Sequence, residues 1–154
     1  MKPFVPEGFT APTRLDAHAF HLRPLVISDV VKDYDAVMTS VEHLHKQIPA
    51  DVFHEVWLSP SMTIEDDLAD LGWHQVEFRN RTSFTYTVMN SDESQCLGCV
   101  YVLPPRFTDA DAEVFLWVRK SEFDRGLDRI VFDAVRQWMK DAWPFKNVGF
   151  PFRK

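Results

Sequence analysis

Cysteine and long apolar runs are both scarce in this chain. Its 154 residues include only two cysteines. No apolar stretch approaches the roughly 20 residues that a membrane-spanning helix requires. The N-terminal stretch MKPFVPEGFTAPTRLDAHAF contains prolines and acidic residues, and it lacks the apolar centre of a signal peptide. These absences predict a cytoplasmic protein without a membrane span.

Basic residues are also in the minority. Lysine and arginine number 17 against 23 aspartates and glutamates, which gives a formal net charge of −6. Binding to nucleic acid or to an anionic membrane needs a basic face, so we expect neither as a partner. Apolar residues, by contrast, make up 45% of the chain and include 13 phenylalanines. That is ample for the packed core of one folded domain.

The two cysteines, Cys96 and Cys99, form a C-x-x-C motif inside the run QCLGCVYVL. Such a pair can be a redox couple or half of a zinc site. In an extended strand, however, residues three apart point to opposite faces. No second pair of cysteines or histidines lies at zinc-finger spacing. We therefore expect two ordinary strand cysteines and no metal site.

Hydrophobic periodicity predicts a single α/β domain. Residues 1–18 are Pro-rich and read as an extended arm, and residues 19–25 as a first strand. Two helices are expected over residues 28–45 and 63–78, the second beginning with a capping box of Thr63 and Asp66. Strands follow in TSFTYTVMN, CLGCVYVLP and AEVFLWV, then a helix over residues 124–142 and a short strand in KNVGFPF. The predicted order is β-α-α-β-β-β-α-β, with residues 19–154 as the domain.

The apolar residues of each predicted helix recur at helical spacing and define the face expected to pack on the sheet. These faces are Val30, Val31, Tyr34, Val37, Met38, Val41 and Leu44 in the first helix; Ile64, Leu68, Leu71 and Gln75 in the second; and Leu127, Ile130, Val131, Ala134, Val135, Trp138 and Met139 in the last.

The order of elements resembles that of the GNAT acyltransferases. The stretches that carry the resemblance are LRPL followed by SDVVKDYDAV, then TIEDDLADL, then TSFTYTVMN with CLGCVYVLP, and finally AEVFLWV at residues 112–118. Together they span residues 19–150. The resemblance implies a mixed, mostly antiparallel sheet flanked by helices. Family members usually continue with a further helix and two strands, and we expect this chain to lack them.

In that family the fourth strand leads into a turn of the form (Q/R)-x-x-G-x-(G/A). The backbone amides of this turn, at the start of the next helix, hold the pyrophosphate of acetyl-CoA. Here the matching residues are Phe123-Asp124-Arg125-Gly126-Leu127-Asp128, in which only Gly126 agrees with the pattern. The resemblance implies that the residues in contact with the cofactor are Leu116, Trp117, Val118, Arg125, Gly126, Leu127, Asp128 and Arg129.

Asp128 is the main departure from the family pattern. A carboxylate within about 4 Å of a phosphate costs on the order of 4 kcal/mol at an effective dielectric constant near 20, or roughly a thousandfold in affinity. Arg125 and Arg129 flank it and can offset part of that cost. Alternatively, the carboxylate points away from the ligand and bonds to another side chain. Acidic residues also favour a helix start for their own sake, so the turn need not bind a ligand at all.

Two further regions contain candidate site residues. Glu113, on the fourth strand, is the candidate base that removes a proton from an attacking amine, or else a solvated strand end. The segment between the first two helices, which helps to form the acceptor site in the resembled family, holds His43, His45, His54, Glu55 and Trp57. H-x-H with H-E nearby suggests a metal cluster, but the spacing matches no recognised ligand motif.

The resemblance implies an N-acetyltransferase that transfers an acetyl group from acetyl-CoA to an amine of a small molecule or a protein. The alternative is a non-catalytic GNAT-like interaction module that has lost CoA binding. A metal hydrolase built on the histidine-rich segment is a third, weaker hypothesis. The negative charge suits a cationic acceptor, and the exposed edge of the last strand predicts a homodimer.

Overall fold

A curled six-stranded sheet forms the centre of the computed structural model, which describes residues 2–48 and 58–153. The strands are β1 (Leu15–Asp16), β2 (His21–Pro24), β3 (Phe84–Met89), β4 (Cys96–Leu103), β5 (Ala112–Val118) and β6 (Val148–Gly149), and they lie side by side in that order. Neighbouring strands are antiparallel except for β5 and β6, which are parallel. The expected mixed, mostly antiparallel sheet is therefore confirmed.

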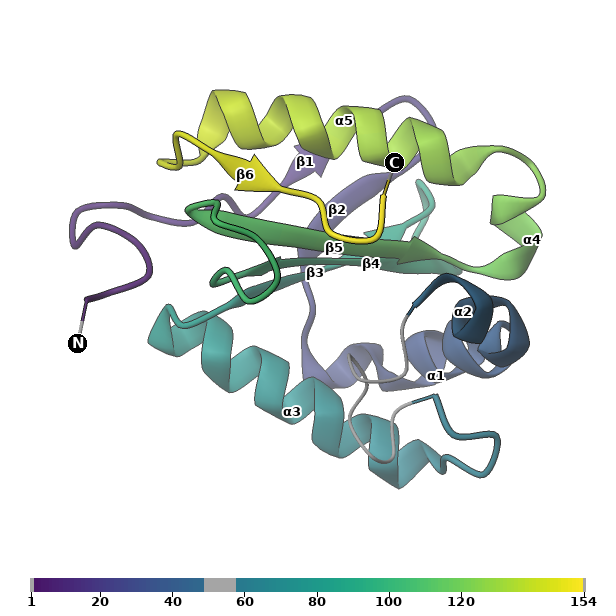
Figure 1. Cartoon of the computed structure of the whole chain (residues 1–154). Helices are drawn as coiled ribbons and strands as arrows, with labels where there is room; N and C mark the ends of the chain where they lie inside the picture. Colours follow the sequence, from purple (N-terminus) through teal and green to yellow (C-terminus); the bar gives the residue numbers. More distant parts are fainter. Residues whose placement is uncertain (1, 49–57, 154) are drawn as a thin grey trace.

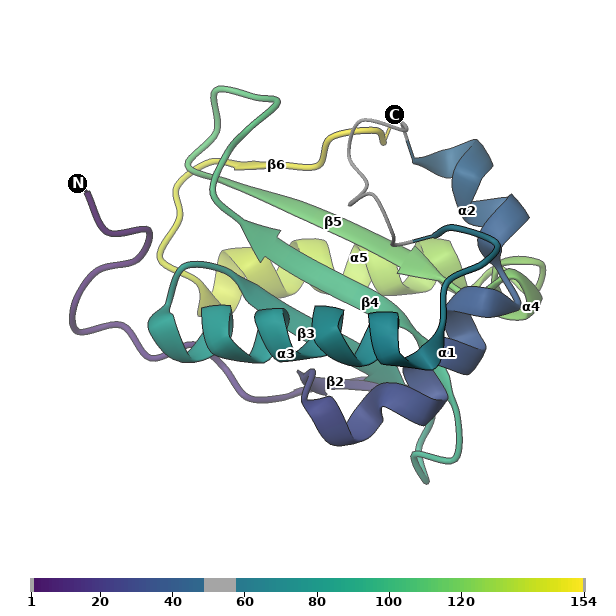
Figure 2. The same cartoon turned by 90° about the horizontal axis from the view of Figure 1, so that it is seen from below.

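Helices cover both faces of this sheet (Figure 1). The helices are α1 (Val30–Met38), α2 (Val41–Gln47), α3 (Ile64–Asn80), α4 (Lys120–Phe123) and α5 (Leu127–Ala142), and a 3-10 turn, η1 (Ile27–Asp29), precedes α1. Helix α5 lies on one face, whereas α1 and α3 lie on the other (Figures 1 and 2). No helix in the described residues is both long and apolar enough to cross a membrane.

Side chains of β5 alternate between two apolar clusters, one on each face of the sheet. Val114, Leu116 and Val118 pack in the cluster under α5, and Phe115 and Trp117 pack on the side of α1 and α3. This division agrees with the faces that strand alternation predicts. As a result, β5 is held from both sides, and its last residues have a fixed position.

The N-terminal residues lie against the rest of the chain and contribute to its core. Val5 and Ala11 belong to the cluster under α5. The Tyr86 hydroxyl donates to the carbonyl of Pro12 at 2.6 Å, and the ring of Phe9 packs against that of Trp143 at 5.4 Å. The arm also contains β1, which adds an antiparallel strand beside β2.

The predicted faces of the helices are wrong at several positions. Val31 is 68% exposed and Ile130 is 56% exposed, although both were assigned to buried stripes. Instead, Asp33 of α1 and Asp67 of α3 are buried, and Phe132 is buried in α5. A helix can rotate about its axis to suit its neighbours, and packing against the sheet has selected faces that a count of apolar residues does not give.

Helix boundaries also differ in part from the prediction. The first helix is interrupted at Thr39 and Ser40, which separate α1 from α2. The last helix begins at Leu127 and not at residue 124, because Gly126 takes a left-handed conformation with φ of 87°. The capping box at the start of α3 is confirmed: the Thr63 hydroxyl accepts from the amide of Asp66, and the Asp66 carboxylate accepts from the amide of Thr63.

Strand β4 contains a β-bulge next to the loop that joins it to β3. Gly98 pairs with Val88 and Cys96 pairs with Met89, so the intervening Leu97 has no partner on β3. An extra residue shifts the alternation of side chains by one position. Consequently Cys96 and Cys99 both face α1 and α3. The expectation that the two cysteines point to opposite faces is wrong for this reason.

An ionic network ties the β3–β4 loop to β2. The Glu93 carboxylate accepts from His21 Nε2 at 2.6 Å and from Arg23 Nε at 2.9 Å, and Arg23 also pairs with Asp29 at 2.8 Å. The hydrogen bonds from Arg23 and then His21 lower the pKa of Glu93 from 4.5 to about 2. The folded state therefore favours the ionised form of Glu93.

We expect Glu93→Gln to destabilise the protein at neutral pH by about 1 kcal/mol, a modest value because the side chain is partly solvated. Ionised Glu93 stabilises the fold above about pH 4.5, and this contribution is lost as the pH falls towards about 2. Melting temperatures over that interval should therefore fall more steeply for the wild type than for the variant. Glu42→Gln, at an exposed position, is the matched control, and parallel curves for wild type and Glu93→Gln would contradict the assignment.

Candidate functional site

The parallel strands β5 and β6 are joined only at one end. They pair at Ala112 with Val148 and at Glu113 with Gly149, and beyond these positions β5 and the segment that follows β6 diverge (Figure 2). The remainder of β5 continues to Val118, with β4 as its neighbour on the other side. Among the predicted site residues, Leu116, Trp117 and Val118 lie on this diverging part and are buried.

The turn that follows β5 is anchored by Arg119. Its amide donates to the carbonyl of Leu97 in the bulge at 2.8 Å. Its buried guanidinium donates to the carbonyl of Cys96 at 3.1 Å and to the carboxylate of Asp35 at 3.1 Å. The next amide, that of Lys120, donates to the Ser40 hydroxyl at 3.0 Å. The start of the turn is thus fixed to β4 and to the end of α1.

Gly126 ends the turn and is the N-cap of α5. Its left-handed φ of 87° favours glycine, although a Cβ would meet nothing within 4 Å. The amides of residues 122–126 donate to carbonyls within the turn itself. The first amides of α5, at Leu127, Asp128 and Arg129, have no acceptor within their own helix. The backbone amides that can donate to an anion are therefore those of the first turn of α5, which begins immediately after Gly126, and not those of the preceding turn.

Asp128 is paired with a cation from the C-terminal segment. Its carboxylate accepts two hydrogen bonds from the guanidinium of Arg153, at 2.7 and 3.0 Å. The same guanidinium stacks over the ring of Phe132 at 4.7 Å, and Phe150 packs against that ring at 5.1 Å. Asp128 therefore bonds to another side chain, one of the two arrangements that the sequence left open, and its charge is compensated.

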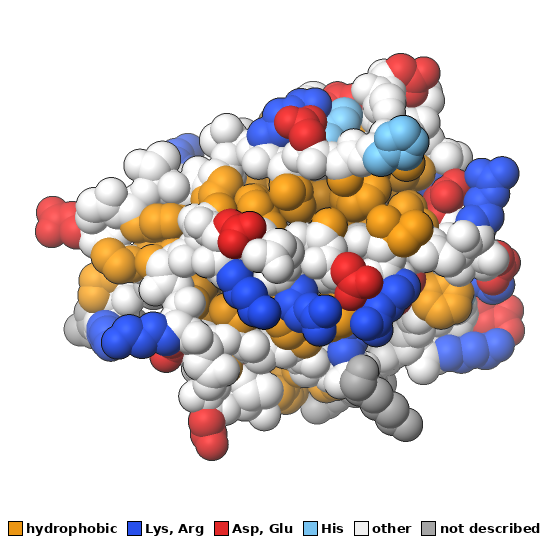
Figure 3. Space-filling model, turned by 90° about the horizontal axis from the view of Figure 1, so that it is seen from above, with side chains coloured by type: hydrophobic (Ala, Val, Ile, Leu, Met, Phe, Trp, Pro, Cys, Tyr) orange, Lys and Arg blue, Asp and Glu red, His pale blue; other side chains and the backbone are white. Residues whose placement is uncertain are grey.

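Other basic side chains gather on the same face of α5 (Figure 3). Arg129 and Arg136 each lie 5.5 Å from the centre of the Phe132 ring. Arg129 pairs with Asp133 at 3.2 Å, and Arg125 pairs with Glu122 at 3.6 Å. Both arginine side chains are exposed and such pairs contribute little, so both arginines are available to a negatively charged ligand at the helix start.

Glu113 is engaged with the loop that joins β4 to β5. Its two carboxylate oxygens accept from the amides of Arg106 and Phe107, each at 2.8 Å. Burial raises the pKa of Glu113, but these hydrogen bonds outweigh that effect and hold the pKa below its ordinary value. The side chain is buried and not a solvated strand end. In this arrangement Glu113 holds the loop, and both of its oxygens are occupied.

The histidine-rich segment is only partly described, because His54, Glu55 and Trp57 lie outside the described residues. His43 packs against the ring of Phe123 at 4.5 Å, and its Nε2 is buried without a hydrogen-bond partner. Burial, followed by the charge of Lys120, lowers the pKa of His43, which keeps the ring neutral. His45 interacts instead with the carbonyl of Leu58 at 2.7 Å. His43 and His45 therefore do not converge on one site.

Three further residues, Arg153, Asp33 and Asp67, were not predicted from the sequence as candidate site residues. Arg153 reaches Asp128 from 25 positions along the chain, and no local pattern announces such a contact. Asp33 and Asp67 are buried beneath the sheet. The sequence contains one signal that these two aspartates are buried. Asp67 lies one helical turn before the buried Leu71, and Asp33 lies one helical turn before the buried Val37, so each shares a helix face with a buried residue.

The chain has a fold similar to that of solved acetyltransferases of the GNAT type. A solved structure with this fold is the ribosomal-protein-S5-alanine acetyltransferase of Vibrio fischeri, with a TM-score of 0.64 and 18% identity over 83% of this chain and 67% of that one. Another is RimL, a ribosomal L7/L12 alpha-N-protein acetyltransferase in complex with coenzyme A, with a TM-score of 0.62 and 13% identity over 83% and 66%.

A third similar structure is that of an acetyltransferase with a role in self-immunity. It is the microcin C7 self-immunity acetyltransferase MccE in complex with acetyl-CoA and AMP, with a TM-score of 0.63 and 10% identity over 86% of this chain and 71% of that one. The chain thus spans about two thirds of the length of these proteins. A scan against protein-family models and a search of curated proteins both find no match.

Proposed function

We propose that the chain is an acyl-CoA-dependent N-acetyltransferase that moves an acetyl group from acetyl-CoA to an amine. One observation carries the proposal: β5 diverges from β6 and leads, through Gly126, into the open N-terminus of a long helix. Similar structures with this fold are described in complex with CoA or acetyl-CoA. A strand that leads through a turn to the N-terminus of a long helix suits an extended ligand with a diphosphate at one end.

The diphosphate would lie at the start of α5. The first-turn amides of Leu127, Asp128 and Arg129 point out of the helix, and the helix dipole adds about half a positive charge there. Arg125 and Arg129 supply further positive charge, and Arg153 compensates the carboxylate of Asp128. The pantetheine arm would follow the side of β5 that faces away from β4, at Leu116, Trp117 and Val118.

The reaction would be direct attack by a neutral amine on the thioester carbon. Backbone amides in the gap between β5 and β6 would stabilise the developing oxyanion, and the thiol of CoA would leave without a covalent enzyme intermediate. The role of Glu113 as the base stays a prediction. With both oxygens engaged and a lowered pKa, Glu113 would first have to release a loop amide before it accepted a proton.

The acceptor is proposed only as a class. The net charge of −6 favours a cationic amine, such as a polyamine, an aminoglycoside or a lysine side chain. Proteins with similar structures are described as acting on ribosomal proteins or conferring self-immunity to a microcin, so both protein and small-molecule amines are candidates. The homodimer and the cytoplasmic location stay predictions, and β6 is the edge strand through which a second copy would pair.

We expect acetyl-CoA at about 100 times its dissociation constant to stabilise the wild-type protein by about 2.7 kcal/mol. For a chain of this length, that corresponds to a rise of about 5–10 °C in the melting temperature. Pantetheine, which lacks the diphosphate, is the matched control ligand and should raise it much less. Release of the CoA thiol in the presence of a panel of amines then measures catalysis. No shift with millimolar acetyl-CoA would favour the interaction module over the enzyme.

A further inference from the structure

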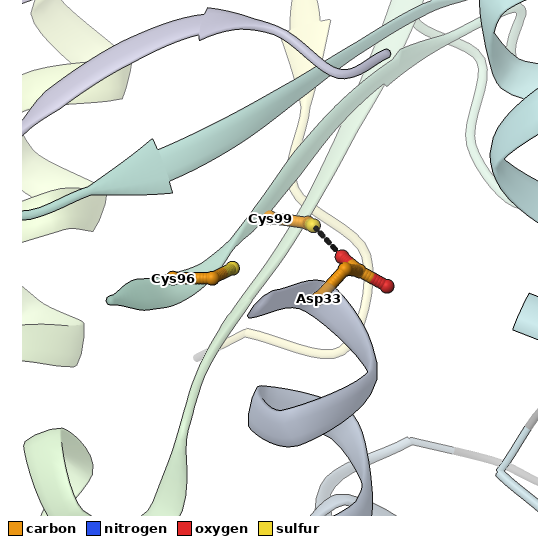
Figure 4. A group of neighbouring side chains, drawn as sticks. All are labelled: Asp33, Cys96 and Cys99. Carbon is orange, nitrogen blue, oxygen red and sulfur yellow. Dashed lines mark hydrogen bonds between the residues drawn. The ribbon is translucent and has the colours of Figure 1, made fainter. Parts of the chain in front are cut away.

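A group of three buried side chains lies on the face of the sheet opposite α5. It consists of Asp33 from α1 and of Cys96 and Cys99 from β4 (Figure 4). One ligand atom from each residue, two sulfurs and one carboxylate oxygen, lies within 4.8 Å of the other two. All three residues are at most 3% exposed. The group lies on β4, where Cys99 pairs with Trp117 of β5, and on the face of the sheet away from the start of α5.

The bulge at Leu97 creates this group. Without the extra residue, the two sulfurs would project from opposite faces, whereas here both point towards α1. Cys99 Sγ lies 3.4 Å from Asp33 Oδ1, to which it donates. In a tetrahedral zinc site, bonds of about 2.3 Å to sulfur and about 2.1 Å to oxygen separate the two ligand atoms by about 3.6 Å. The observed separation suits two ligands of one ion.

Asp67 of α3 provides an independent observation at the same place. Its side chain is fully buried beside that of Asp33, and apart from the Asp33 carboxyl neither of its oxygens has a hydrogen-bond partner among the described residues. No ion pair in residues 2–48 and 58–153 involves Asp33 or Asp67. The nearby guanidinium of Arg119 pairs with Asp35 instead. Two adjacent buried carboxyl groups without a cationic partner are costly to ionise, and a cation held by Asp33 and the two sulfurs would offset that cost.

We propose that Asp33, Cys96 and Cys99 bind a thiophilic divalent cation of the zinc type, with the adjacent carboxyl of Asp67 supporting the ligand Asp33 from outside the coordination shell. Thiolates select zinc and related metals over magnesium or calcium. Binding breaks the two S–H bonds, forms two metal–sulfur bonds and releases two protons to solvent. Because all three ligand residues are at most 3% exposed, the role we assign to the ion is structural and not catalytic.

Such an ion would fasten α1 to β4 beside the bulge. The carbonyl of Leu97 in that bulge accepts from the amide of Arg119, the first residue after β5. The metal would therefore set the position of the turn that leads to α5. The proposal does not depend on acetyl-CoA binding, since metal content is measured without any substrate.

The test uses the wild-type chain purified from cells grown with added zinc. Elemental analysis should find about one zinc ion per chain, and removal by a strong chelator should lower the melting temperature until zinc is restored. Cobalt(II) added to the stripped protein should give a sulfur-to-cobalt charge-transfer band. Cys96→Ser and Cys99→Ser should abolish that band, and Asp67→Asn should weaken cobalt binding about 10–100-fold.

Thr87→Val is the matched control, because its hydroxyl contacts Cys96 Sγ at 3.5 Å without being a candidate ligand. This variant should keep the cobalt band. The proposal is overturned if the wild type contains no metal and gives no band, or if Cys99→Ser binds cobalt as tightly as the wild type. It is equally overturned if mild oxidation of metal-free wild type yields a Cys96–Cys99 disulfide and zinc does not protect the thiols.

Discussion

Arg153→Ala is expected to weaken acetyl-CoA binding by about a hundredfold. In the wild type, the guanidinium of Arg153 compensates the carboxylate of Asp128 through two hydrogen bonds. Its removal leaves an unpaired negative charge at the helix start where the diphosphate would lie. At 5–6 Å and an effective dielectric constant near 20, a unit charge costs about 3 kcal/mol, which is about a hundredfold in affinity.

Isothermal titration of CoA into the variants measures this effect. Arg136→Ala is the matched control: it removes another arginine beside Phe132, one that pairs with Asp133 and not with Asp128. Its affinity should stay close to that of the wild type. Asp128→Asn should bind CoA more tightly than the wild type, and adding it to Arg153→Ala should restore most of the loss. Equal affinities in the wild type and all four variants would show that the diphosphate does not lie at this helix start.

The sheet could be predicted because its signals are local and redundant. Strict alternation in AEVFLWV assigns Val114, Leu116 and Val118 to one face and Phe115 and Trp117 to the other, and the structure agrees. The cap at Thr63 depends on two residues three apart, which a sequence displays directly. The order of elements then limits the possible folds to a few.

The candidate site was less predictable because its key contacts join distant segments. The pairing of Asp128 with Arg153 depends on the path of the chain after β6, and nothing near Asp128 encodes it. The bulge at Leu97 changed which face Cys96 occupies, since one extra residue reverses the alternation. In α3, Asp67 is buried and Leu68 is exposed. Packing against the sheet determines which face of this helix is buried, and that face is not the more apolar one that contains Leu68.

Gly98→Ala is expected to be the most destabilising single substitution considered for this chain. A Cβ at Gly98 would lie 2.0 Å from the carbonyl oxygen of Trp117 and 2.9 Å from the Cα of Val118. Both obstacles are backbone atoms of β5, which cannot rotate away as a side chain can. Overpacking of a core typically lowers the free energy of unfolding by about 1–3 kcal/mol. Because this clash is with backbone atoms, we expect a loss of about 3 kcal/mol or more. The melting temperature should fall by about 6–12 °C.

The clash would also propagate to the candidate site, because Gly98 pairs with Val118 and the adjacent Leu97 carbonyl accepts from Arg119. Pushing β4 away from β5 lengthens that hydrogen bond and displaces the turn before α5. Acetyl-CoA binding should therefore weaken together with stability. Gly72→Ala in α3 is the matched control, with only Ile27 Cγ2 nearby at 4.0 Å, and it should stabilise by about 0.5–1 kcal/mol. If Gly98→Ala melted no lower than the wild type, the close approach of β4 and β5 at the bulge would be wrong, and with it the placement of the cysteines.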